Sequence, residues 1–277
     1  MGAQEGMKRL GLVVHARRPE PREFAARFCQ AATARGFTIV GDATTGQIVE
    51  QQVEGGDADL WVAIGGDGTV LAASQQAVAS DVPVLAFNLG TIGFLAEAEV
   101  SQMDEVLDAL ADGRLSERTR MTIAASLPNG TVVQGINDIV VEKIHSQRLV
   151  SLTVEIDGEH FLTYRADGLV AATSTGSTAY SFSAGGPLVD PSVETLLLTP
   201  VAPHSLFART LILSPESRLQ IEVSTDRPVR VSVDGLEIGS LGEGEAVDVA
   251  RGERSARFLT LDGHTFPATV KDKFRLH

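Results

Sequence analysis

The stretch Leu60-Trp61-Val62-Ala63-Ile64-Gly65-Gly66-Asp67-Gly68-Thr69 decides how the first part of this chain folds. Its apolar beginning predicts a buried strand, and its glycines let backbone N–H groups come close to a ligand. A helix is expected to follow, from Val70 to about Ala79. A strand that runs through a glycine-rich loop into a helix is the usual geometry for holding phosphate at a helix N-terminus.

The charged side chain of this loop has the wrong sign for a phosphate. Asp67 would repel the ligand, so it either binds a metal that holds the phosphate or accepts a proton from a hydroxyl that attacks phosphorus. The simpler alternative is a tight turn with Asp67 as a helix cap. The loop lacks the Lys of a P-loop, and the dinucleotide pattern fails because Leu71 stands where its last Gly belongs.

Composition limits the class of protein. A chain of 277 residues with 43% hydrophobic content forms one large domain or two ordinary ones. The formal charge of −13 argues against a nucleic-acid partner. We expect no membrane partner, because no apolar run approaches the roughly 20 residues of a span. We also expect no secretion signal. The lone Cys29 suits a reducing cytoplasm, and its helical apolar setting predicts a buried, neutral thiol.

Strand and helix patterns alternate over residues 1–115, which predicts an open, mainly parallel sheet covered by helices. Helical spacing and caps predict two helices besides the one after the glycine loop, at Pro21 to Arg35 and from about Ser101 to Gly113. The other expected strands are Leu10 to Val14, Phe37 to Val40 and Val84 to Phe87.

Residues 116–257 are β-rich and predict an all-β, sandwich-like second domain. Met121 to Leu127 and Thr131 to Val141 read as two strands, and Asp157-Gly158 and Asp234-Gly235 are hairpin turn signals. We assign these Asp-Gly pairs to turn chemistry rather than to catalysis. Residues 258–277 form a tail that ends in the basic stretch Lys271 to Arg275, whose docking the sequence does not indicate.

The β-rich part contains a run of small and hydroxyl-bearing residues from Thr173 to Pro187. Hydroxyls at this density can bind ribose and phosphate oxygens without adding charge. Tyr180 can stack on a base or a nicotinamide ring. The alternative is a helix capped by Ser or Thr, with polar surface residues around it.

Four motifs in this order resemble the NAD kinase family, over about residues 8 to 265. They are Gly65-Gly66-Asp67-Gly68-Thr69, Asn88-Leu89-Gly90-Thr91-Ile92-Gly93-Phe94-Leu95, Asn137-Asp138, and Thr175-Gly176-Ser177-Thr178-Ala179-Tyr180 continuing to Gly185-Gly186-Pro187. The first motif is shared with diacylglycerol and sphingosine kinases, whereas the second and fourth separate the families. The resemblance implies transfer of the γ-phosphate of ATP to the 2′-hydroxyl of the adenosine ribose of NAD, giving NADP, with Asp67 as the proton acceptor.

The resemblance also implies the binding residues. Gly68 is expected to contact substrate through its backbone, Phe94 to lie beside the adenine, and Asn137 and Asp138 to hold the dinucleotide. Ligand contacts are further implied for Arg148, Arg165 and Asp167, and for the segment that wraps the NAD: Thr178, Ala179, Tyr180, Ser181, Phe182 and Ser183.

Asp167 carries a hypothesis about substrate choice. Relatives place an Asp against the nicotinamide end, where a carboxylate favours the cationic ring of NAD over the neutral ring of NADH. The alternative is that Asp167 pairs with Arg165 and orders the loop.

We expect Mg²⁺ or Mn²⁺ to arrive with ATP, because the acidic loop cannot neutralise a triphosphate, and we assign no protein ligand to the metal. His145 and His204 lack a second ligand at zinc spacing. Family resemblance implies a homodimer or homotetramer. Two other classes remain to be weighed: a lipid kinase would need an exposed apolar or basic membrane surface, and a non-catalytic nucleotide sensor would have lost Asp67.

Overall fold

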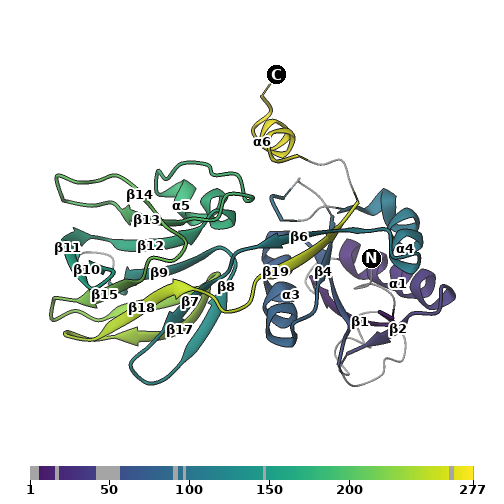
Figure 1. Ribbon diagram of the computed structural model, residues 1–277, viewed down its shortest axis with the longest axis horizontal. Helices are drawn as coiled ribbons and strands as arrows, with labels where there is room; N and C mark the ends of the chain where they lie inside the picture. Colours follow the sequence, from purple (N-terminus) through teal and green to yellow (C-terminus); the bar gives the residue numbers. More distant parts are fainter. Residues whose placement is uncertain are drawn as a thin grey trace. The chain divides into compact units, whose positions relative to one another are not determined.

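The computed structural model describes residues 6–15, 19–41, 57–89, 93–95, 98–145, 148–261 and 265–276. The chain divides into two compact units (Figure 1). The first unit combines residues 1–119 with residues 256–277, and the second comprises residues 120–255.

The first unit is built on a sheet of strand order β2-β1-β3-β4-β19-β6, with β5 beside β4. The pairings of β1 with β2 and β3, and of β4 with β3, β5 and β19, are all parallel, which confirms the expected parallel sheet. The strands are β1 (Arg9–Val14), β2 (Thr38–Val40), β3 (Leu60–Gly65), β4 (Val84–Asn88), β5 (Ala98–Glu99), β6 (Ser116–Arg120) and β19 (Ala256–Thr260).

Helices lie on both faces of this sheet, as Figure 1 shows. Crossovers between parallel strands are right-handed, and β1 and β3 send the chain to opposite sides, so α1 and α3 cover opposite faces. On the α1 face, Phe24 and Phe28 pack on Phe87 of β4, with ring centroids 5.2 Å and 5.5 Å apart. The helical elements are α1 (Pro19–Ala34), α3 (Asp67–Ser80), the 3-10 turn η1 (Val100–Gln102), α4 (Met103–Ala111) and α6 (Phe266–Phe274).

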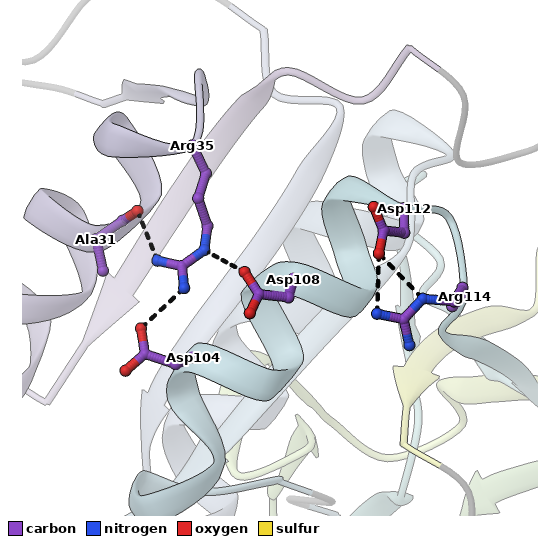
Figure 2. Close-up of polar contacts among 6 residues, drawn as sticks. All are labelled: Ala31, Arg35, Asp104, Asp108, Asp112 and Arg114. Atoms are coloured by element: carbon purple, nitrogen blue, oxygen red, sulfur yellow. Dashed lines mark hydrogen bonds and ion pairs between the residues drawn. The ribbon is translucent and has the colours of Figure 1, made fainter.

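An arginine fork joins α1 to α4 on that face (Figure 2). Arg35 donates from Nε to Asp108 at 2.6 Å and from Nη2 to Asp104 at 3.0 Å, while its Nη1 donates to the carbonyl of Ala31 at 3.2 Å. The hydrogen bond from Arg35 holds the pKa of the Asp108 carboxyl below its usual value. The ion pairs of Arg35 with Asp104 and Asp108 are exposed to solvent, so they orient the two helices more than they stabilise them.

Several boundaries differ from those expected. Helix α3 begins at Asp67 rather than Val70, so the aspartate is the first helical residue and Gly66 is the cap. The boundary expected at residue 116 lies at 120, because β6 pairs with β19 in the first sheet. The tail from residue 258 belongs to the first unit for the same reason, and its last part forms α6.

The second unit is a sandwich of two antiparallel sheets, as the sequence predicted. Their strand orders are β11-β10-β15-β18-β7-β8 and β14-β13-β12-β9-β16-β17. One core holds apolar residues of both sheets, with Tyr164 and Ile139 among them. The elements are β7 (Ile123–Ser126), β8 (Val132–Gly135), β9 (Asp138–Lys143), β10 (Val150–Ile156), β11 (Glu159–Ala166), β12 (Gly168–Thr173), η2 (Thr175–Thr178), α5 (Tyr180–Ser183), β13 (Leu196–Val201), β14 (Leu211–Leu213), β15 (Leu219–Val223), β16 (Val229–Val233), β17 (Leu236–Leu241) and β18 (Ala246–Arg251).

The single strand expected from Thr131 to Val141 is instead two strands in different sheets. The chain leaves β8 after Gly135 and enters β9 at Asp138. The break falls at Ile136 and Asn137 because their backbone N–H groups donate to the carboxylate of Asp234, both at 2.8 Å, rather than to a neighbouring strand. The two predicted Asp-Gly turns are confirmed by left-handed backbone at both residues of each pair.

Two expectations about chain chemistry can be checked on the described residues. Cys29 is fully buried in the α1 face, and burial raises the pKa of its thiol to about 12, which confirms a neutral thiol. Among the described helices, none has the length and apolar character needed to cross a membrane.

Candidate functional site

The glycine loop lies where an open α/β sheet places its ligands. The chain turns one way after β1 and the other way after β3, and ligands bind at the carboxyl ends of the strands beside such a switch point. Gly65 is the last residue of β3. The carbonyl of the preceding residue, Ile64, accepts a hydrogen bond at 3.1 Å from the backbone N–H of His15, which follows β1. The buried Nδ1 atom of His15 has no hydrogen-bond partner in the described part of the chain. Nothing in the sequence pattern singled out this histidine.

The loop itself is tight on one side and open on the other. A Cβ on Gly65 would lie 2.4 Å from the hydroxyl of Thr69, so the start of α3 packs directly on the strand end. Around Gly66 and Gly68, in contrast, a Cβ would meet nothing within 4 Å, and both residues are exposed. The N–H groups of Thr69 and Val70 donate to the Gly66 carbonyl, at 2.8 Å and 3.2 Å, so an anion has room beside the backbone of Gly66 and Gly68.

Asp67 is held from the side by the second motif. The backbone N–H groups of Phe94 and Leu95 donate to its two carboxylate oxygens, at 3.3 Å and 3.4 Å. A Cβ on Gly93 would lie 2.1 Å from Asp67 Oδ1, so a larger residue at this position would push the carboxylate from its observed place. The carboxylate is thus oriented by backbone and remains partly exposed.

Phe94 links this motif to the C-terminal helix. Its ring centroid lies 6.3 Å from that of Phe274, and the Lys273 Nζ lies 5.5 Å from the centre of the Phe94 ring. Phe94 is half-buried, so part of its ring remains accessible. Residues 90–92 of the same motif lie outside the described residues.

A cavity of about 690 Å³ opens on the α1 side of the strand ends. Its lining includes Asn88 and Leu89 at the end of β4 and Arg27 of α1. Leu89 also donates its N–H to the carbonyl of Gly65 at 3.4 Å, which places the cavity beside the glycine loop. A cavity of this size falls in the range of about 300–1,000 Å³ that is usual for small-molecule sites.

The described residues include no group of three or more His, Cys, Asp or Glu side chains arranged to hold a metal ion. Asp67 is a single carboxylate beside a loop that can hold phosphates. That donor set fits Mg²⁺, which is commonly bound by one or two carboxylates together with substrate phosphates.

In the second unit, Asp234 shapes the Asn137-Asp138 motif. Besides its bonds to Ile136 and Asn137, it accepts from the backbone of Asp138 at 3.2 Å. Asn137 is 8% exposed and its Oδ1 has no partner among the described atoms, although most buried polar atoms in proteins are paired. An unpaired buried amide oxygen of this kind makes Asn137 a candidate functional residue.

Two buried carboxylates lie together here. Burial first, and then the charge of Asp234, raise the pKa of Asp138 to about 7, although a hydrogen bond from the Tyr180 backbone opposes the shift. Burial also raises the pKa of Asp234, against the three N–H groups that it accepts. Sequence reasoning assigned Asp234 only to a turn. The turn was correct, but no signal in the sequence shows where its carboxylate points.

Most hydroxyl groups of the hydroxyl-rich segment that are described below form hydrogen bonds with other protein atoms. Ser177 exchanges hydrogen bonds with the backbone of Val189, and the buried Ser181 pairs with Thr199 at 2.9 Å. Thr178 donates to the carbonyl of Thr175 at 3.0 Å. The segment thus presents Tyr180, Phe182 and Ser183 at its surface, with Thr178 and Ala179 half-buried.

Gly176 allows the segment to sit on the Asn137 motif. A Cβ at this position would lie 1.9 Å from the Asn137 carbonyl oxygen, a contact that no side chain can occupy. The Thr173 hydroxyl braces the same junction, because it bonds the Ile136 carbonyl and accepts from the Gly176 N–H at 3.1 Å.

Tyr180 lies in an acidic environment. Burial first, and then the charges of Glu142, Asp167 and Asp138, raise the pKa of its phenol. Asp167 is paired with Lys143, not with Arg165 as the alternative supposed. The antiparallel pairing of β9 with β12 brings these two residues together, and the Lys143 N–H also donates to the Asp167 carbonyl at 2.9 Å.

The candidate residues therefore form two groups, one in each unit. Asp67, Gly68 and Phe94 meet in the first unit, and Asn137, Asp138 and Tyr180 meet in the second. Arg148 and Arg165 are exposed residues of the second unit.

Two family models match the chain. The ATP-NAD kinase N-terminal domain matches residues 44–115, and the ATP-NAD kinase C-terminal domain matches residues 136–261. NAD kinase 2 of Streptomyces avermitilis is 42% identical over 223 residues, which cover 79% of this chain and 74% of that protein. NAD kinase of Moorella thermoacetica is 34% identical over 282 residues, covering 97% of this chain and 90% of that protein.

Solved structures are similar as well. A yeast NADH kinase complexed with NADH matches with a TM-score of 0.90 at 26% identity, covering 98% of this chain and 88% of that one. An NAD kinase from Archaeoglobus fulgidus in complex with ATP matches with a TM-score of 0.70 at 23% identity, covering 97% and 96%, and supports the fold alone.

Proposed function

The chain belongs to the ATP-NAD kinase family, and we propose on that premise that it transfers the γ-phosphate of ATP to the 2′-hydroxyl of the adenosine ribose of NAD. The products are NADP and ADP. The match of both family models, over residues 44–115 and 136–261, carries this proposal, and the lipid-kinase alternative finds no support in the relatives described above.

Asp67 is the group that activates the acceptor hydroxyl. The 2′-oxygen attacks the γ-phosphorus, the bond from that phosphorus to the bridging β,γ-oxygen breaks, and the hydroxyl proton passes to the Asp67 carboxylate. The proposal is supported by the orientation of this carboxylate, which two backbone N–H groups fix at the first residue of α3. A preset geometry of this kind is what general base catalysis requires.

The second unit recognises the dinucleotide. We assign ribose binding to Asn137 and Asp138, because the buried Asn137 oxygen is an acceptor without a partner among the described atoms. Tyr180 and the exposed end of α5 cover the nicotinamide part, where Glu142 and Asp167 supply negative charge. The polar groups of the hydroxyl-rich segment act mainly through their internal bonds, which keep this surface in shape.

The divalent metal comes with ATP. The phosphates of ATP would supply oxygens to the metal, and we assign it no protein ligand because Asp67 accepts the proton. Mg²⁺ or Mn²⁺ bound in this way neutralises charge on the triphosphate. The cavity beside the loop has room for the rest of the donor.

We propose a closed homo-oligomer in the cytoplasm. Leu206 is fully exposed and Phe207 stacks edge-on with Phe161 at 5.9 Å, so the second unit has apolar side chains at its surface that a subunit contact can bury. The inert, buried Cys29 suits a reducing compartment.

A parallel assay tests the proposed function. The purified protein is given ATP and Mg²⁺ together with NAD in one reaction and diacylglycerol in the other, and the products are separated and identified. We expect NADP from the first reaction and no phosphatidate from the second. Phosphatidate without NADP would replace this function by lipid phosphorylation, and binding of NAD without turnover would make the protein a sensor.

A further inference from the structure

The glycine loop provides no positive charge for the phosphates that it holds. Asp67 is its single charged residue, and the chain as a whole has a formal charge of −13. Phosphoryl transfer needs cations at the transferred group, and a metal ion bound with ATP offsets only part of the charge on a triphosphate. A side chain of the first unit that brings a cation to this loop is therefore of interest.

The basic C-terminal helix is such an element. Lys273 Nζ lies over the Phe94 ring, 5.5 Å from its centre, and Phe274 packs on the same ring at 6.3 Å. The Phe94 N–H in turn donates to Asp67 Oδ2 at 3.3 Å. One residue thus separates the Lys273 ammonium from the carboxylate that receives the proton.

The two lysines of the last turn of α6 differ in their surroundings. Lys271 and Lys273 both favour the negative end of the helix dipole, which would explain basic residues here without any ligand. At about 100° per residue, however, two positions are about 200° apart, so the lysines point to opposite faces. Lys273 is the lysine whose ammonium lies over the Phe94 ring, and a dipole role alone gives no reason for that choice of face.

We propose that Lys273 binds a phosphate oxygen of a substrate at the glycine loop, so that α6 supplies the cation that the loop lacks. A lysine suits this role, because it is a point charge on a flexible stem and can turn from the Phe94 ring to an anion. The inference rests on the proposed function. The phosphate belongs either to the triphosphate of ATP or to the pyrophosphate of NAD, and both are tested.

The test compares Lys273→Gln with Lys271→Gln, which removes the same charge from the opposite face of the same helix. KM is measured for ATP and for NAD in the full-length protein, and the dissociation constants of ATP with Mg²⁺ and of NAD are measured by calorimetry. Lys273→Gln should weaken one substrate by about tenfold or more, as for the loss of a hydrogen bond to a charged group. Lys271→Gln should change neither substrate by more than threefold, and Lys273→Arg should restore most of the affinity.

The result identifies the phosphate. If Lys273→Gln raises KM and the dissociation constant for ATP alone, Lys273 binds the triphosphate of ATP. If it raises them for NAD alone, Lys273 binds the pyrophosphate of NAD. Because α6 has no buried residue, both variants should keep the Tm of the wild type. Equal effects of the two Gln variants in calorimetry would overturn the inference. Calorimetry decides this even if the wild-type protein fails to phosphorylate NAD, an outcome that would count against the proposed function alone.

Discussion

The two units hold their acidic groups in opposite ways. In the first unit, Asp67 is partly exposed and accepts two long hydrogen bonds, at 3.3 Å and 3.4 Å. In the second, Asp234 accepts three backbone N–H groups, two of them at 2.8 Å, and Asp138 beside it is only 5% exposed. A carboxylate that must receive a proton has to remain reachable, whereas carboxylates that shape a binding surface can be buried. We infer that the first unit is built for the chemical step and the second for recognition.

Metal removal should have the largest effect, and it acts on the first unit alone. Excess chelator should abolish NAD phosphorylation, because neither the loop nor Asp67 can neutralise a triphosphate. NAD binding, which the second unit provides, should persist in calorimetry under the same conditions. Activity that survives chelation would show that protein cations alone suffice for the transfer.

The same substitution at two glycines should separate the units. Gly93→Ala pushes a Cβ to 2.1 Å from Asp67 Oδ1 and should lower kcat by about 100-fold or more with little change in NAD affinity. Gly176→Ala places a Cβ 1.9 Å from the Asn137 carbonyl and should destabilise the fold by about 1–3 kcal/mol and weaken NAD binding.

Gly242→Ala is the control for both, since its Cβ would make an ordinary contact at 3.6 Å. Kinetics, NAD titration and thermal unfolding of the three variants check the separation. If Gly93→Ala weakened NAD binding as strongly as Gly176→Ala, the division between chemistry and recognition would be wrong.

The buried carboxylates of the second unit should make stability depend on pH. Asp138 has a pKa of about 7 in the folded protein, well above its value of 3.8 in the unfolded chain. Between about pH 4 and pH 7 the unfolded chain thus binds fewer protons, so the free energy of unfolding falls as pH rises. Asp138→Asn should remove this pH dependence, which amounts to about 2–4 kcal/mol in the free energy of unfolding over this interval.

Thermal unfolding without ligand at pH 5 and pH 8 measures this effect. From pH 5 to pH 8, the Tm of Asp138→Asn should fall by less than the Tm of the wild type. Equal losses in both proteins would mean that Asp138 is ionised throughout, and that its burial costs less than its surroundings indicate.

Asp167 should have the smallest effect, on substrate choice. Asp167→Asn removes negative charge beside Tyr180, so the ratio of kcat/KM for NAD to kcat/KM for NADH should fall. We expect a fall of only about threefold, because Asp167 is partly exposed and solvent weakens its electrostatic interactions. Lys143→Met leaves the carboxylate unopposed and should shift the preference the other way. If both substitutions lowered activity on the two dinucleotides equally, the pair would have only a structural role.

Local pattern was enough to predict much of this molecule. The apolar run before Gly65, the helix ends at Gly36 and Gly113 and the Asp-Gly turns all depend on short-range chemistry, and each is present. What the sequence could not show depends on contacts between distant residues. The carboxylate of Asp234 breaks a strand 98 residues earlier in the chain, and the partner of Asp167 comes from a neighbouring strand.

The candidate site follows the same rule. The motifs identified Asp67 and Asn137, but only the fold brings Gly93 against Asp67 and Gly176 against Asn137. The hydroxyl-rich segment also differs from its simplest interpretation, because Ser177 and Ser181 bond within the protein rather than facing a ligand. A count of hydroxyls cannot tell these two uses apart.

The most direct test of the account is the Asp67→Asn variant, measured for both turnover and NAD binding. The substitution removes the proton acceptor and keeps its shape, and general base catalysis contributes about 10²–10⁴-fold. We predict that kcat falls by that factor while the NAD dissociation constant and Tm stay at wild-type values. Turnover within threefold of wild type would contradict the role of Asp67, and with it the assignment of the chemical step to the glycine loop.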